Sequence, residues 1–446
     1  MRTRKPLMIT VAATLALVVA ACSPGESADS PTTSANTQSS AAPVKGDGGN
    51  PDLSQFKGKS LTYVYFTDGK ADEDATRAAI GRFEQASGAK VNLQIVAFAD
   101  LLTSLQARVA GGDAPEVART ADWRSLSSNL VDFKQYAGSD YPSSFTPGYV
   151  KTALDGNGAM LAVPSDLTIN GPFVNVDAFN KAGVPVPTKW TWDEAVAAAK
   201  KVAAANGMQY PIAIDKSSNR VSTVLSQYGT NLIAAGNKVG LDTTKTTAAL
   251  TFLTDLIKND TISKDFWIGS GSKYKGANDM FLAGQSAVYL SGPWQVGAFA
   301  ASAKFKWAVV PDPCAERCGG FPGGKYMVAF KNSKEPALAA AFVEWMNSSE
   351  QQKQIDQQAY WLPTRDDLVK SGLSYPTHND DMNVFIKEIA NTPEDTYDSM
   401  ASPAFTDAGK SLLTEMDKVV AGNEDVATAV TNIQAGTTKA IEKATK

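Results

Sequence analysis

The chain has 446 residues, and the part beyond about residue 53 is too long for one hydrophobic core, which predicts two domains. Its 42 Lys and Arg residues are outnumbered by 46 Asp and Glu residues, giving a formal net charge of −4. This mild acidity favours solubility and argues against a nucleic-acid binder. No run of basic residues beyond the first few positions suggests a surface that reads phosphates.

The N-terminus has the pattern of an export signal. Arg2, Arg4 and Lys5 precede an apolar stretch, 11–21, that is short for a membrane span but suits a signal peptide. Small residues then run directly into Cys22, a pattern that resembles the bacterial lipobox. The resemblance implies a signal peptide over 1–21, cleavage before Cys22 and lipidation of its thiol, as in a palmitate-bearing lipoprotein. The alternative is an ordinary signal peptide that happens to precede a cysteine.

The next segment, 22–52, is predicted to be a disordered tether. It is dominated by Ser, Thr, Pro, Ala and Gly and has no hydrophobic periodicity. About thirty flexible residues have a reach on the order of 30 Å. A folded body beyond them is therefore expected outside the cytoplasm, lipid-anchored to the outer face of the cell membrane.

The first part of the folded region alternates strands and helices. Runs of β-branched and aromatic residues predict strands, and apolar residues on one face predict helices. The resulting βαβαβ order indicates a parallel sheet, in which ligands lie beyond the carboxyl ends of the strands. The predicted strands are 60–66, 90–96 and 115–118, and the predicted helices are 74–87, ended by Gly88, and 100–110, capped by Asp100.

Later elements are marked by capping signals. Thr191 and Glu194 form a T-x-x-E capping box that predicts a helix to about residue 205. Pro336 suits the first turn of another helix, whose Trp345 lies on an apolar stripe. A helix–turn–strand passage is expected at 279–288 and 307–310, and the last long helix at about 412–420.

Cysteine use agrees with an exported protein. Besides Cys22, the chain has only Cys314 and Cys318, and outside the cytosol this pair is most simply a local disulfide. A zinc site is the alternative, but it would need more ligands, and His378 is the single histidine. No metal and no cofactor are expected.

Four segments in order resemble the family 1 extracellular solute-binding proteins, the maltose-binding-like group. The chain departs from the family at Glu116, where Asp is usual, and at Val174, where a tyrosine is common. Together the segments span nearly all of the folded chain. The four segments are 83–117, 163–194, 281–294 and 319–365.

The resemblance implies an α/β, two-lobed periplasmic-binding-protein fold (class II-like), with parallel-sheet lobes joined by a hinge. The first lobe is expected to comprise 53–164 plus 323–366, and the second 165–322 plus 367–446. A ligand would bind in the cleft between them, and closure of the lobes would be sensed by the permease subunits of an ABC importer. A monomer that binds a sugar is expected.

A sugar site needs aromatic platforms and paired polar groups. The resemblance places Trp294 where the family has a stacking aromatic, and Asp68, Arg119, Asp122 and Asp166 near the cleft. Each has a plainer interpretation, core packing for the aromatics and a surface ion pair for the charged groups. Four other tryptophans are assigned to packing: Trp190, Trp192, Trp307 and Trp345. The expected ligand-binding residues are Phe66, Asp68, Arg119, Asp122, Trp123, Asp166, Asn170, Trp267, Tyr274, Trp294, Tyr326, Trp361 and Arg365.

An enzyme is the main alternative class of function. A Ser-His-Asp hydrolase would have to use His378 as its base, and the sequence has no phosphate-binding loop, so an enzyme is not expected. A glycosidase stays an alternative, because it needs only two carboxylates. The same fold could bind a glycerophosphodiester or a polyamine, or serve as a sensor without a transporter. The mixture of aromatic, Asp and Arg residues favours a neutral polyol.

Overall fold

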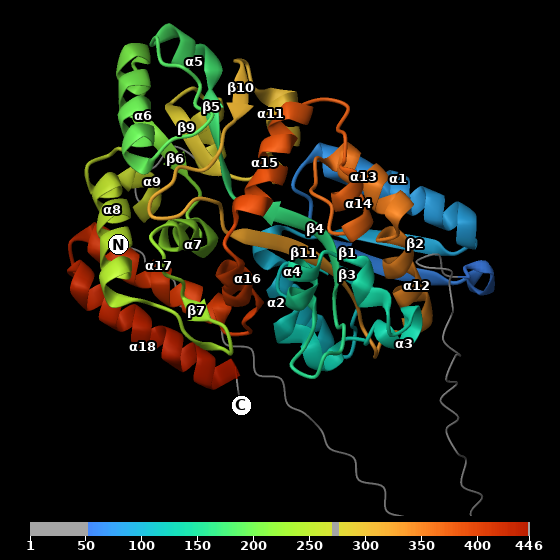
Figure 1. Ribbon diagram of the computed structural model, residues 1–446. Helices are drawn as coiled ribbons and strands as arrows, with labels where there is room; N and C mark the ends of the chain where they lie inside the picture. Colours follow the sequence, from blue (N-terminus) through green and yellow to red (C-terminus); the bar gives the residue numbers. More distant parts are fainter. Residues whose placement is uncertain (1–51, 270–275, 445–446) are drawn as a thin grey trace, which may run out of the picture. The chain divides into compact units, whose positions relative to one another are not determined.

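Two separate β-sheets organise the protein in the computed structural model, which describes residues 52–269 and 276–444 (Figure 1). All of these residues belong to one unit, Ala42–Lys446. Within the described ranges, no helix combines the length and apolar character needed to cross a bilayer.

The first lobe is built on a five-stranded sheet with the order β2-β1-β3-β11-β4. One face of the sheet carries α1, α12 and α13, whose apolar residues, including Phe342 of α12, form a buried cluster with Tyr63 of β1. The strands are β1 Ser60–Tyr65, β2 Lys90–Ile95, β3 Val117–Thr120, β4 Val163–Ile169 and β11 Pro322–Ala329. The helices are η1 Ser54–Phe56, α1 Lys70–Ser87, α2 Phe98–Ala110, η2 Arg124–Asn129, α3 Lys134–Ala137, η3 Tyr141–Ser144, α4 Pro147–Val150, η4 Lys151–Ala153, α12 Pro336–Met346, α13 Ser349–Ala359 and α14 Asp366–Ser371.

The second lobe is built on a four-stranded sheet with the order β10-β5-β9-β6, plus a small β7-β8 ribbon. The strands are β5 Gly171–Asn175, β6 Tyr210–Ile214, β7 Ile233–Ala234, β8 Lys238–Val239, β9 Ser286–Ser291 and β10 Trp307–Val309. The helices are α5 Val176–Lys181, α6 Trp192–Asn206, α7 Ser218–Gln227, α8 Thr243–Lys258, α9 Lys264–Ile268, α10 Ala277–Leu282, η5 Pro293–Gln295, α11 Val296–Ser302, α15 Asn379–Asn391, α16 Glu394–Ala401, α17 Phe405–Ala421 and α18 Val426–Ala444.

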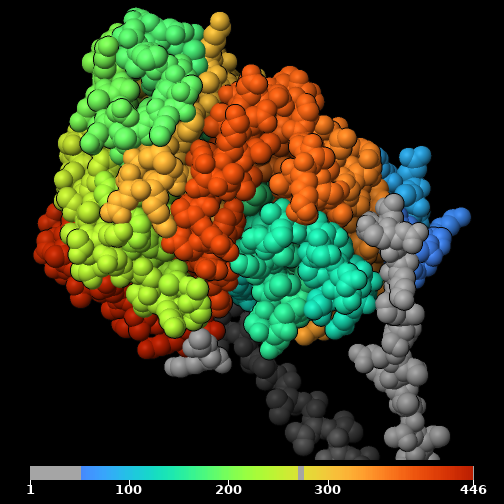
Figure 2. All heavy atoms as spheres, viewed as in Figure 1, coloured from blue at the N-terminus to red at the C-terminus, as the bar shows by residue number. Residues whose placement is uncertain are grey.

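The chain passes between the sheets more than once. β4 pairs within the first sheet to Ile169, and β5 begins the second sheet at Gly171. After β10 the chain returns through β11, which inserts between β3 and β4. The lobe boundaries given above stay a prediction, but these crossings explain why one sheet is assembled from distant segments. In Figure 2 the orange-red atoms around α15 lie between the green atoms of the second lobe and the blue-green atoms of the first.

The predicted parallel sheets need a correction, because both sheets are mixed. β1 pairs in parallel with β2 and β3, as the βαβαβ pattern predicts, and β6 pairs in parallel with β9. The pairs β3–β11, β4–β11, β5–β9 and β5–β10 are antiparallel. A strand that enters from the other lobe has no local helix crossover to impose parallel pairing.

Most predicted capping features are confirmed. Thr191 Oγ1 accepts a hydrogen bond from the Glu194 backbone at 3.3 Å, and Gly88 ends α1 in the left-handed conformation at φ 67°. Asp100 was wrong as a cap, because α2 begins at Phe98 and Asp100 lies in its first turn.

The C-terminal helix was also predicted too short. α17 extends over Phe405–Ala421, and a further helix, α18, follows it. Ala and Thr dominate α18, so its apolar stripe, around Val430 and Ile433, is sparse and was missed. These two residues are nevertheless buried in the second lobe's core.

Candidate functional site

The carboxyl ends of the three parallel strands form one wall of the candidate site. Phe66 and Asp68 follow β1, Phe98 follows β2, and Asp122 follows β3. Ligands of α/β sheets bind at this edge, because loops of different strands converge there. Phe98 is 60% exposed, and its ring centroid lies 4.9 Å from that of buried Phe66.

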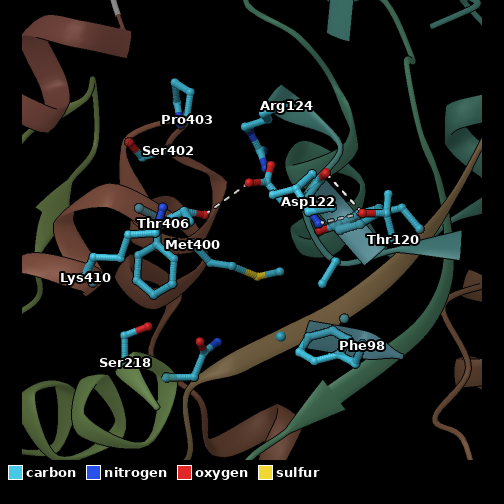
Figure 3. Close-up of a pocket in the computed structure, with 18 of the residues that line it drawn as sticks. Phe98, Thr120, Asp122, Arg124, Ser218, Met400, Ser402, Pro403, Thr406 and Lys410 are labelled. Carbon is cyan, nitrogen blue, oxygen red and sulfur yellow. Dashed lines mark hydrogen bonds between the residues drawn. The ribbon is translucent and has the colours of Figure 1, made fainter. Parts of the chain in front are cut away.

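A cavity of about 340 Å³ opens beside this wall. Its other side is formed by α7, α16 and α17 of the second lobe, so both lobes line it (Figure 3). The hydroxyl of Thr406 lies 3.5 Å from a carboxylate oxygen of Asp122 and links the two sides. The polar lining residues are Thr120, Asp122, Arg124, Ser218, Asn219, Tyr326, Ser402, Thr406 and Lys410, and the apolar ones include Phe98, Leu101, Leu102, Met400, Phe405 and Leu413.

Two glycines of β11 form part of the cavity wall. A Cβ atom at Gly323 would lie 2.7 Å from Thr168 Oγ1, and one at Gly324 would lie 2.7 Å from the Asp166 carbonyl and overlap the Tyr149 hydroxyl. Only glycine therefore lets β11 approach β4 and Tyr149 this closely.

A buried ion cluster lies next to the cavity, on β3, β4 and β11. The Arg119 guanidinium is 3.0 Å from Asp68, 2.9 Å from Asp166 and 3.5 Å from Asp72. Lys325 lies 3.6 Å from Asp68 and 3.5 Å from Asp166. Although burial by itself raises the pKa of Asp68, Lys325 and Arg119 together hold this pKa below its ordinary value. Asp68 and Asp166 are therefore each paired with both cations of the cluster.

Aromatic rings enclose the central cation. The Arg119 Cζ atom lies 4.4 Å from the ring centroid of Phe66 and 4.3 Å from that of Trp361. Phe66 therefore contacts both Arg119 of the ion cluster and Phe98 of the cavity lining.

Trp294 lies between cations from the two lobes. Its ring is 4.5 Å from Arg220 Cζ of α7 and 5.5 Å from Lys325 Nζ of β11. Arg220 in turn pairs with Asp215 at 3.1 Å and donates to the side chain of Asn170. Because Trp294 contacts a residue of each lobe, this half-buried side chain lies where the two lobes meet.

The structure brings some predicted residues together and leaves others apart. Asp122 and Tyr326 line the cavity. Asp68, Arg119 and Asp166 belong to the ion cluster, and the rings of Phe66 and Trp361 lie against its Arg119. Trp294 and Asn170 lie at the lobe junction. Trp123 and Trp267 are core residues whose indole N–H groups bond Thr152 and Asp417. Arg365 bonds Asp367 and Asn347 in the first lobe, and Tyr274 lies outside the described residues.

The remaining predictions concern packing and crosslinks. Trp190, Trp192 and Trp345 are buried, as predicted. Cys314 and Cys318 form a disulfide with their Cα atoms 4.4 Å apart. Across residues 52–269 and 276–444, no group of three or more His, Cys, Asp or Glu side chains could hold a metal ion.

Sequence reasoning missed several lining residues. Phe98 had a usable signal, because it is an aromatic residue directly after a predicted strand. Ser218, Thr406 and Lys410 gave no such signal, since they lie on helices of the second lobe.

Comparison with curated proteins finds distant relatives. The arabinooligosaccharide-binding protein of Bacillus subtilis (strain 168) is 25% identical over 262 residues, covering 54% of this chain and 58% of the relative. The sn-glycerol-3-phosphate-binding periplasmic protein UgpB of Rhizobium meliloti (strain 1021) is 24% identical over 304 residues, covering 65% and 69%. The match thus spans less than two thirds of the arabinooligosaccharide-binding protein.

Comparison with solved structures and family models gives the fold and the family. The GacH receptor of Streptomyces glaucescens GLA.O, solved unliganded and with acarbose, is similar with a TM-score of 0.74 at 22% identity, covering 86% of this chain and 99% of that one. This agrees with the two-lobed arrangement. A family model described as bacterial extracellular solute-binding protein matches residues 67–353. Since this match covers well over half of the chain, the protein belongs to the family of bacterial extracellular solute-binding proteins.

Proposed function

We propose that this protein captures a carbohydrate in the cavity between its lobes and delivers it, by lobe closure, to the permease of an ABC importer. The observation that carries the proposal is the cavity of about 340 Å³, lined by both lobes, in which exposed Phe98 lies near polar Asp122 and Arg124. A sugar offers an apolar CH face for the ring and hydroxyls for the charged groups.

The charge balance supports a neutral ligand. In the cavity lining, Arg124 lies with Asp122, and Lys410 is 3.2 Å from Asp407. Beside the cavity, Arg119, Arg220 and Lys325 each lie within 4 Å of at least one carboxylate. An anion such as glycerol phosphate, which a relative's name mentions, would have to compete with these carboxylates. A neutral sugar can instead accept and donate among them without breaking a pair.

The wider context of the proposal comes from sequence and family. Relatives named for arabinooligosaccharide and maltodextrin binding support a sugar ligand. We propose a binding role without catalysis, a monomeric protein, and a lipid anchor on Cys22 at the outer face of the cell membrane. Cys22 and the proposed tether lie outside the described residues, apart from residue 52.

A thermal-shift panel tests the ligand class. The protein would be scanned with maltotriose, an arabinooligosaccharide, sn-glycerol 3-phosphate and spermidine. A ligand at 100 times its Kd stabilises the folded protein by about 2.7 kcal/mol, which raises Tm measurably. A rise with a carbohydrate, and with neither charged probe, is expected.

Two variants place the binding event and a third controls for surface changes. Phe98→Ala and Asp122→Asn should each abolish most of the shift, because they remove the ring and the carboxylate that line the cavity. Ile268→Ala removes a similarly exposed apolar side chain outside the cavity and should keep the full shift. A shift only with sn-glycerol 3-phosphate or spermidine, or none with any carbohydrate at millimolar concentration, would refute the sugar proposal.

A further inference from the structure

The chain crossings between the lobes are packed so closely that only glycine fits at several positions. A Cβ atom at Gly171, where the chain enters the second sheet, would lie 2.7 Å from the ring of Phe385 on α15. One at Gly319, on the return crossing, would overlap the backbone of Asn391 at the end of the same helix. α15 itself packs against β10 of the second lobe and β4 of the first. Any movement of the lobes must therefore alter the packing around α15.

Two carboxyl groups are buried at this junction. Asp312, on the return crossing, is 5% exposed, and Glu388, on α15, is 3% exposed. Within residues 52–269 and 276–444, Asp312 Oδ2 and Glu388 Oε2 have no hydrogen-bond partner, and the other Glu388 oxygen accepts from Asn391 at 3.2 Å. A Cβ atom at Gly320 would lie 2.9 Å from Asp312 Oδ2, so the carboxyl faces the crossing strand. Unpartnered buried carboxylates are costly, which favours a neutral form.

The charged surroundings do not neutralise the pair. Arg220 of α7 is the cation that faces Asp312, but it is already bonded to Asp215 and to the Asn170 side chain. Burial first, and then repulsion by Glu388, raises the pKa of Asp312 well above its ordinary value, and Arg220 only partly opposes this. Burial likewise raises the pKa of Glu388.

We propose that Asp312 and Glu388 form a proton-binding site at the lobe crossing, and that loss of a proton from this site opens the cleft. Two buried carboxyls that repel each other titrate as a coupled pair. In the compact arrangement described here both carboxyls are buried away from water, so ionising both of them costs free energy. Opening the crossing admits water and lets the second proton leave.

The direction of the effect follows from linkage. A carboxyl whose pKa is raised in the compact arrangement binds more protons there than in an open one. The compact arrangement is therefore favoured at low pH, and this preference is lost as the pH rises above the ordinary carboxyl range of about 4. If one proton is linked, the closing equilibrium shifts by up to about tenfold per pH unit.

Interlobe distance measurement tests this without any ligand. Spin labels would be attached to Thr103→Cys on α2 and Thr414→Cys on α17, two exposed helical positions near the two sides of the cavity, in a Cys22→Ser background. The label distance should lengthen between pH 5 and pH 9. Glu388→Gln, which is neutral at every pH, should keep the short distance throughout. Asp312→Asn provides the same test if the Gln variant folds poorly.

A matched control uses another buried acid. Glu344 on α12 is 3% exposed, burial raises its pKa to about 7, and it lies in the first lobe away from the crossings. Glu344→Gln should keep the pH-dependent distance change of the parent protein. An unchanging distance in the parent, or the same change in Glu388→Gln, would overturn the proposal. The inference rests on the lobe movement proposed above, but a failed sugar panel leaves it testable because no sugar is used.

Discussion

Replacing Arg119 by methionine should destabilise the first lobe, because it leaves Asp68, Asp72 and Asp166 grouped around an uncharged side chain. Removing one partner of a buried ion pair costs about 3–5 kcal/mol. Lys325 remains 3.6 Å from Asp68 and 3.5 Å from Asp166, so the lower end, about 3 kcal/mol, is expected. At about 2.1 cal/mol/K per residue, this is a fall in Tm of about 4 °C for a domain pair of this length.

The pH dependence of this loss of stability provides a second test of the same prediction. The pKa of Asp68 is lowered in the folded protein, so its contribution is present above the ordinary carboxyl pKa and is lost as pH falls through the folded value. Without Arg119 that lowering weakens, and the stability difference between parent and variant should shrink as pH falls from 7 toward 3.5. Urea unfolding followed by circular dichroism at pH 7, 5 and 3.5 measures this difference.

A surface pair supplies the control for the Arg119 experiment. Arg77 and Glu73 are 2.8 Å apart on α1, with roughly half and a third of their side chains exposed. Arg77→Met should cost about 0.5 kcal/mol or less, with little pH dependence. A loss for Arg119→Met as small as this, or one that stays constant from pH 7 to pH 3.5, would show that the ion cluster does not act as argued.

Three further substitutions test single features of the fold. Gly324→Ala should lower the free energy of unfolding by about 1–3 kcal/mol or more in thermal unfolding, because its methyl group would overlap Tyr149. Gly156→Ala, which has open space around it, should not lower it, and equal effects of the two substitutions would contradict the argument. Thr191→Ala should cost about 1 kcal/mol in urea unfolding through loss of the capping box, and a neutral result would remove its role. Cys314→Ser should cost about 2 kcal/mol, and the parent protein unfolded under reducing conditions should show the same loss.

Local features were largely predictable because they depend on neighbouring residues. The Thr191–Glu194 capping box, the left-handed Gly88 and the Cys314–Cys318 disulfide each follow from residues within a few positions of one another. The parallel part of the first sheet was also predictable, since β1, β2 and β3 are joined by short helical crossovers. Asp100 failed as a cap because backbone geometry placed the helix start at Phe98.

The candidate site was likewise predictable only in part from the sequence. The sequence, through hydrophobic alternation, turn residues and its family resemblance, predicted two α/β lobes and placed Asp122 at a strand end, where the structure has it lining the cavity. It did not determine that α17 would complete the cavity, or that Arg220 and Lys325 would flank Trp294. Arg220 and Trp294 are 74 positions apart, Trp294 and Lys325 are 31 apart, and Asp122 and Thr406 are 284 apart, so only the packing of the two lobes brings them within reach. Tertiary structure decided them because pairing across such distances depends on the packing of the whole chain, which no local pattern of residues encodes.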